Sequence, residues 1–254
     1  MCGIRITLSI CSVCIVSLVI LIIRHCRKPI ALYSGKETPM AYSDFTLNDI
    51  KQKLHLNIEE ETSLFISVPD AAPSAWLVET LEQTQPLAIK IGTEKARSEL
   101  IIAPIMVEFR NLTQHQISLF SGINFNVDPS RGLTGFCDFI LSRSREQLSL
   151  NSPVFIVVEA KNENIIAGIP QCIATMFASR IFNERTGMLT PIVYGAVSTG
   201  TNWRFILLRD NKAYVDLDEY HISQINKLLG ILRSIYDNTE PVAIGSSEVV
   251  QKAA

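Results

Sequence analysis

Two apolar segments of the sequence carry ionisable residues of the types that hydrolytic metal centres use. Asp138 lies within the apolar run 135–141, and Glu159 and Lys161 end the run Val-Phe-Ile-Val-Val-Glu-Ala-Lys at 154–161. In a β-strand, side chains two residues apart point to the same face. Glu159 and Lys161 are therefore expected side by side, and Asp138 joins them if the two strands pair.

Two carboxylates and one amine at one place match the needs of phosphodiester hydrolysis. Carboxylate oxygens are hard ligands suited to Mg²⁺ or Mn²⁺, and a Mg²⁺ ion held in this way keeps several waters and contacts phosphates. Such an ion lowers the pKa of a bound water and offsets negative charge in the transition state. The amine of Lys161 would orient the attacking water or stabilise the developing charge.

A simpler interpretation is a salt bridge at a strand end between Glu159 and Lys161, with Asp138 unrelated to it. For an isolated Glu-x-Lys pair, this would be the better interpretation. However, a charged side chain inside an apolar strand is costly unless it is paired or metal-bound. The position of Asp138 therefore favours the metal site.

The surrounding patterns predict which elements position these residues. Helices are predicted over 44–54, 76–84, 93–110, 168–183 and 222–236, and strands over 63–68, 116–121, 125–127, 135–141, 154–160, 192–197, 203–208 and 213–217. The almost continuously apolar strand 154–160 is typical of a central strand buried on both faces. Pro104 should kink the third helix, and Gly-Ile-Pro at 168–170 should open the fourth. This order predicts an α/β fold with a mixed central sheet flanked by helices.

Composition separates the first 39 residues from the rest of the chain. Residues 6–23 carry no charge and are long enough for one membrane-spanning helix. The basic residues that follow this apolar helix would place the main domain in the cytoplasm, anchored to the inner face of the membrane. A wrongly assigned start upstream of Met40 explains the segment equally well. The expected divisions are an apolar segment (1–39), a helical lead-in (40–92), the α/β domain (93–239) and a disordered tail (240–254).

The motif around the acidic residues resembles a known signature. Gly-Phe-Cys-Asp at 135–138, followed by Glu-Ala-Lys at 159–161, is similar to the (P)D…(D/E)xK pattern of the PD-(D/E)XK nuclease superfamily. The run 153–161 with Gln171 resembles largely bacterial members and the nuclease domains of type I restriction subunits. The similarity covers residues 93–215. It implies a restriction-endonuclease-like sheet and a nuclease that depends on Mg²⁺ or Mn²⁺.

The resemblance also implies a set of metal ligands. Asp138 and Glu159 would bind the ion, and the backbone carbonyl of Ala160 would supply a further ligand. An acidic residue on the helix before the sheet often completes the site in this superfamily, and Glu99 matches that position. Glu108 lies nine residues later and faces about 180° away on an α-helix, so only one of the two can face the site.

The remaining implied roles fall on Lys161 and on the helix that follows it. Lys161 would act on the water or the phosphate. Gln171 matches a polar position on the helix after the Glu-x-Lys strand. Thr175 stands where related exonucleases often have a tyrosine, so the match on this helix is partial.

The distribution of charge supports a second hypothesis. Residues 1–39 hold five of the 23 Lys and Arg and one of the 25 Asp and Glu, which leaves 18 basic and 24 acidic residues after them. Nucleic-acid binders usually carry a basic surface. The acidic body therefore favours a non-catalytic binding or scaffold protein with the same fold, membrane-tethered if residues 6–23 form an anchor. The sequence does not indicate an oligomeric state.

Overall fold

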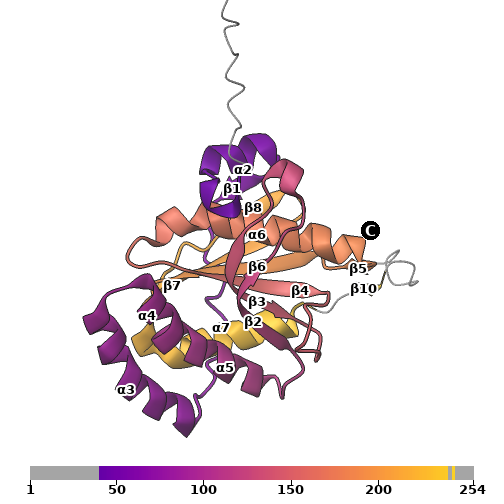
Figure 1. Ribbon diagram of the computed structural model, residues 1–254. Coiled ribbons are helices and arrows are strands. Elements are labelled where there is room, and N and C mark those ends of the chain that lie inside the picture. Colours follow the sequence, from indigo (N-terminus) through magenta and orange to yellow (C-terminus); the bar gives the residue numbers. More distant parts are fainter. Residues whose placement is uncertain (1–39, 240–241, 244–254) are drawn as a thin grey trace, which may run out of the picture. The chain divides into compact units, whose positions relative to one another are not determined.

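The computed structural model of the protein describes residues 40–239 and 242–243 (Figure 1). Within them a mixed sheet lies between helices on its two faces, which confirms the predicted α/β class. The apolar helix predicted within residues 1–39 lies outside the described residues. So does the predicted tail at 240–254, apart from Val242–Ala243.

The described residues form one sheet of eight strands, in the order β1-β8-β7-β6-β4-β3-β2 with β9 paired to β7. The strands are β1 (Asn57–Glu59), β2 (Ser118–Asn124), β3 (Phe136–Ser142), β4 (Val154–Ala160), β6 (Ile192–Ser198), β7 (Asn202–Arg209), β8 (Lys212–Val215) and β9 (Tyr220–His221). Strand β4 pairs antiparallel with β3 and parallel with β6, and all of its residues are buried, as its apolar sequence predicts. A second, small sheet pairs β5 (Met188–Leu189) with β10 (Val242–Ala243).

Helices cover both faces of the main sheet and enclose two apolar cores. The helical elements are η1 (Tyr42–Asp44), α2 (Leu47–Lys53), α3 (Ala75–Ile91), α4 (Glu94–Arg97), the π-helical turn η2 (Ser98–Ile102), α5 (Ala103–Leu112), η3 (Pro129–Arg131), α6 (Ile165–Arg185), η4 (Ile222–Gln224) and α7 (Ile225–Asp237). Helices α2 and α6 pack on one face, and α3, α5 and α7 on the other (Figure 1). Strand β4 contributes side chains to both cores.

Helix α6 is the crossover between the parallel strands β4 and β6. It begins at Ile165, earlier than the predicted Gly168, because the side chain of Asn164 accepts a hydrogen bond from the backbone N–H of Ala167 and caps the helix. Pro170 therefore lies inside the helix and not in its first turn. Among the described helices, α6 alone is long and apolar enough to cross a membrane, yet most of it is buried in the core.

Three further sequence predictions need correction. The segment 63–68 is not a strand, because the backbone N–H of Leu64 bonds to the carboxylate of Asp216 and not to a neighbouring strand. No separate strand forms at 125–127, since β2 already runs to Asn124. The helical lead-in also supplies strand β1, which pairs in parallel with β8. The helix predicted over 93–110 is divided into α4, the π-helical turn η2 and α5, and Pro104 lies in the first turn of α5.

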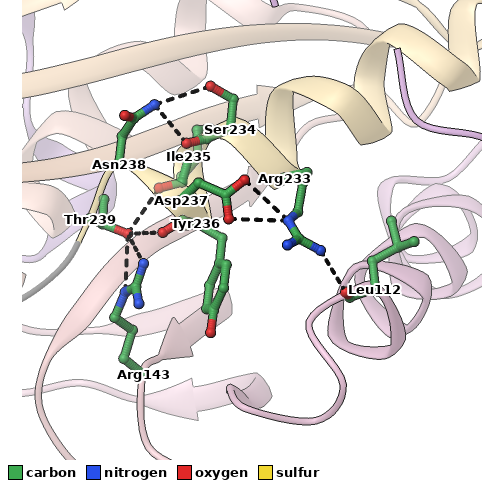
Figure 2. A network of polar contacts seen from close by, with 9 residues as sticks. All are labelled: Leu112, Arg143, Arg233, Ser234, Ile235, Tyr236, Asp237, Asn238 and Thr239. Atoms are coloured by element: carbon green, nitrogen blue, oxygen red, sulfur yellow. Dashed lines mark hydrogen bonds and ion pairs between the residues drawn. The ribbon is translucent and has the colours of Figure 1, made fainter. Parts of the chain in front are cut away.

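Polar contacts hold the end of α7 against β3 and α5 (Figure 2). Arg143, which follows β3, donates to the hydroxyl of Thr239 at 3.2 Å, and its guanidinium lies 4.2 Å from the ring centre of Tyr236. Arg233 donates to the carbonyl oxygen of Leu112, the last residue of α5, at 3.0 Å. These contacts join the helices that lie opposite α6.

Asn183 ties the last turns of α6 to the beginning of β4. Its side chain is fully buried, and its Oδ1 accepts a hydrogen bond from the N–H of Val154 at 2.8 Å. Its Nδ2 donates to the carbonyl of Val154 at 2.7 Å and to the hydroxyl of Thr190 at 2.8 Å. One amide therefore satisfies both backbone groups of the first residue of the central strand.

The Asn183→Ala variant would leave both backbone groups of Val154 buried without a partner. Each such group costs about 1–3 kcal/mol, so we expect the free energy of unfolding to fall by roughly 2–5 kcal/mol in urea titrations. Asn238→Ala is the matched control, because that side chain is exposed and bonds only within α7. Equal losses in the two variants would contradict this role of Asn183.

Candidate active site

Strands β3 and β4 separate at the position of Asp138. Their last paired residues are Phe139 and Val158, whereas β4 continues beside β6 as far as Ala160. In the opening, Oδ2 of Asp138 accepts a hydrogen bond from the backbone N–H of Ala160 at 2.8 Å. The carboxylate takes the place of a backbone carbonyl and is held between the two strands.

The amine of Lys161 lies between oxygen atoms of β4 and α6. It donates to Oε1 of Glu159 at 2.7 Å and to Oε1 of Gln171 at 3.1 Å. The backbone N–H of Lys161 donates to the carbonyl of Ser198 at the end of β6, at 2.8 Å. The structure therefore brings together three of the residues singled out from the sequence. It fixes the amine between β4 and α6 and the backbone of Lys161 against β6.

The charges at this strand end act on one another. Burial raises the pKa of Glu159 to about 8, and the neighbouring charge of Asp138 adds to the rise. Burial lowers the pKa of Lys161, but the charges of Glu159, Glu94 and Asp138 raise it, and the net shift is upward. Lys161 thus stays protonated at neutral pH, within an excess of acidic groups.

Glu94, the first residue of α4, is a third carboxylate of this group that sequence reasoning missed. Its charge raises the pKa of both Glu159 and Lys161, which places it near the two. The available signal was its position directly after the helix cap Thr93. Acidic residues are common in first helical turns because their negative charge is stabilised by the positive end of the helix dipole. An acidic residue at this position therefore does not by itself indicate a functional site.

Glu99, the acidic residue predicted on this helix, lines a cavity together with Glu94 and Asp138. The cavity holds about 280 Å³. Glu99 forms an ion pair with Lys95 at 2.7 Å, and its side chain is 59% exposed. Glu108 instead accepts hydrogen bonds from the backbone and hydroxyl of Ser74, away from this cavity.

The donor set fits magnesium or manganese better than a metal that needs a full protein cage. Within residues 40–239, no group of three or more His, Cys, Asp or Glu side chains is arranged to hold a metal ion. Mg²⁺, however, is commonly bound through one or two carboxylates together with waters and substrate phosphates. Asp138 and Glu159 supply two carboxylates. Burial is the main cause of the raised pKa of Glu159, and the charge of Asp138, which a bound cation would offset, adds to it. Ala160, whose carbonyl is the third predicted ligand, lies at the same strand end.

Neither Thr175 nor the two cysteines near the site is arranged as a nucleophile. The hydroxyl of Thr175 donates to the backbone carbonyl of Gln171 within α6 at 3.0 Å. Burial raises the pKa of the thiols of Cys137 and Cys172, so both stay protonated and unreactive.

No protein-family model, curated protein or solved structure matches the chain. The chemistry of the site therefore depends on its own geometry. That geometry comprises a carboxylate held between two diverging strands, a buried acid with a raised pKa and an amine fixed between Glu159 and Gln171.

Gly168 leaves the space in which the side chain of Lys161 lies against α6. A Cβ atom at this position would lie 2.6 Å from Cγ1 of Val197 and 3.0 and 3.1 Å from Cγ and Cε of Lys161. We expect Gly168→Ala to displace the amine and to lower the free energy of unfolding by about 1–3 kcal/mol through overpacking. Ala167→Ser, at an exposed position of the same turn, should change neither. A crystal structure of Gly168→Ala with Lys161 unmoved would contradict the prediction.

The raised pKa of Glu159 predicts how stability depends on pH in the metal-free protein. Between its ordinary pKa of 4.5 and about 8, the folded state holds this proton more tightly than the unfolded state does. The free energy of unfolding should therefore fall as pH rises through this range, by a few kcal/mol from this group. Glu159→Gln should remove that part of the dependence. Guanidinium titrations in EDTA from about pH 5 to 9 measure it, and parallel curves for the two proteins would refute it.

Proposed function

We propose that this protein is a Mg²⁺- or Mn²⁺-dependent phosphodiester hydrolase that acts on nucleic acid. The observation that carries the proposal is the convergence of Asp138, Glu159 and Lys161 at one strand end, with Gln171 from the following helix. These residues lie on apolar strands, and burial makes the charged form of the Glu159 carboxyl unfavourable without a nearby cation. This is the environment in which a divalent cation and a phosphate group bind together.

Some residues of the site would bind the metal ion, and others would act on the phosphate. Asp138 and Glu159 would hold the metal, with Glu94 or Glu99 completing its surroundings from the preceding helix. When bound, the metal supplies an activated water and offsets charge on the phosphate. Lys161 is protonated and fixed between two oxygen acceptors, so it acts as a cation that stabilises the developing negative charge, not as a base. Gln171 keeps that cation in place.

The order of elements supports a restriction-endonuclease-like class. The helical run from α4 to α5 precedes the antiparallel strands β2, β3 and β4, and α6 then leads to β6, which is parallel to β4. From the resemblance to the PD-(D/E)XK superfamily, we expect an acidic residue on the helix before the sheet and a polar residue on the helix after the Glu-x-Lys strand. Glu99 and Gln171 occupy those two helices.

A second candidate is a non-catalytic binding or scaffold protein with the same fold. The excess of acidic residues after residue 39 favours it, because a phosphate backbone is attracted to basic surfaces. Either candidate would be tethered to the inner face of the membrane if residues 6–23 form the anchor that the sequence predicts. The two candidates differ in whether metal binding leads to cleavage.

Two substitutions separate metal binding from catalysis. Lys161→Met keeps the aliphatic chain beside Gly168 and removes the charge, so cleavage should fall by about 10²–10³-fold while Mg²⁺ or Mn²⁺ still raises the melting temperature. Asp138→Asn keeps an oxygen for the N–H of Ala160 but removes a ligand charge, so both cleavage and the metal-induced shift should be lost. Thermal melts and cleavage assays on single-stranded DNA, duplex DNA and RNA give the readouts.

Lys51→Met is the matched control for the lysine variant. That side chain is exposed on α2 and lines neither cavity, so its loss should leave the wild-type melting temperature and the metal response nearly unchanged. If neither Mg²⁺ nor Mn²⁺ raises the wild-type melting temperature and no substrate is cleaved, the binding protein becomes the better assignment. If Lys161→Met cleaves at the wild-type rate, the ion pair with Glu159 is only structural.

A further inference from the structure

A cavity of about 470 Å³ lies beside the proposed centre and shares no lining residue with the acidic cavity. Its walls come from Arg97 of α4, from residues 162–166 and from residues 199–202. Asn162 follows Lys161 directly in the chain, so one wall of the cavity continues from the residue that carries the amine. A volume of this size accommodates a small organic group.

The location of the cavity follows from the parallel pair at the centre of the sheet. The segment 162–164 leaves the carboxyl end of β4, and the turn 199–201 leaves the carboxyl end of β6. In open α/β sheets, ligands bind in the crevice outside the carboxyl ends of parallel strands. The cavity therefore occupies a place that the topology creates, and the side chain of Arg97 bridges it from α4 by donating to the carbonyl of Thr199 at 2.9 Å.

The side chains of the lining suit a neutral polar ligand better than a bare phosphate. Its charged groups are one cation, Arg97, and two anions, Glu163 and Glu219. This balance gives no attraction for a polyanion. The other polar members are amides and hydroxyls, which both donate and accept hydrogen bonds. Ile165 and Ile166 add apolar surface. A nucleobase combines a polar edge that donates and accepts with flat apolar faces.

Two buried polar atoms of the lining residues lack hydrogen-bond partners among the described residues. They are Oδ1 of Asn162, an acceptor, and Nε of Arg97, a donor. Buried polar atoms are nearly always paired with protein, water or ligand. Both atoms have almost no exposed surface, so an occupant of the cavity would reach them only after the side chains of Asn162 and Arg97 turn.

We propose that this cavity binds one unpaired nucleobase of the substrate while the adjoining phosphate lies at Lys161. This rests on the proposed nuclease function and deepens it by naming the substrate class. A base stacked inside a duplex cannot enter such a pocket without leaving the helix. The protein therefore acts on single-stranded nucleic acid, or on unpaired ends and loops.

Direct binding of nucleosides to the whole protein tests the cavity without relying on catalysis. Adenosine, guanosine, cytidine and uridine, together with thymidine, are titrated in EDTA and followed by NMR. At least one should bind, and Asn202→Ala should weaken it about tenfold, the effect of losing one hydrogen bond. The side chain of Asn202 lines the cavity and has no hydrogen-bond partner among residues 40–239, so its removal should spare the fold.

Asn111→Ala is the matched control, since that exposed asparagine of α5 lies outside the cavity. It should leave nucleoside binding unchanged, as should Lys161→Met. With Mg²⁺ or Mn²⁺ present, single-stranded oligonucleotides should be cleaved faster than the same sequences in a duplex, and Asn202→Ala should raise their KM.

The results separate failure of the cavity from failure of the nuclease proposal. Cleavage that is indifferent to Asn202→Ala, or absence of nucleoside binding, overturns the base pocket and leaves the hydrolase standing. Nucleoside binding that depends on Asn202 without any cleavage supports the pocket and removes the nuclease. Equal cleavage of duplex and single strands overturns the substrate class.

Discussion

Helix α6 is attached to strand β4 by polar side chains near both of its ends, and the arrangement of the candidate site depends on this double attachment. At one end, the side-chain amide of Asn183 makes the two hydrogen bonds that a neighbouring strand would otherwise make with the backbone of Val154. At the other, Gln171 accepts a hydrogen bond from Lys161. Parallel strands cannot be joined by a tight turn, so β4 and β6 need a crossover. Because this crossover is fixed at both ends, the position of the helix face beside Lys161 is fixed too.

The site makes opposite demands on stability and on chemistry. Several carboxylates surround a single amine, and burial raises the pKa of Glu159 because its charge is poorly solvated there. In a protein selected only for stability, an apolar residue at the end of β4 would cost less. The hydrogen bond from Ala160 to Asp138 shows how the fold tolerates the arrangement, since the carboxylate also serves as a backbone partner. Sequences that break local rules in this way often do so at functional sites.

The sequence predicted the parts of the fold that depend on local pattern. Strand β4 was predicted with the bounds observed, because burial on both faces leaves an uninterrupted apolar run. The sheet class followed from the order of elements. Asp138, Glu159 and Lys161 could be singled out because their charges interrupt apolar runs. Contacts between distant segments were not predictable in this way, and β1 is an example, since three residues form a strand only through their pairing with β8.

The π-helical turn η2 makes the geometry of the site depend on chain length as well as on residue type. A π turn accommodates one residue more than the α-helical turn it replaces. Deleting one residue within 100–102 would keep every residue of the site, yet it would rotate Glu94 by about 100° relative to α5. Helix α5 cannot rotate to compensate, because Glu108 holds it to Ser74. In an alignment of related sequences, a one-residue deletion in this helix would therefore mark proteins that have the same site residues but a different site geometry.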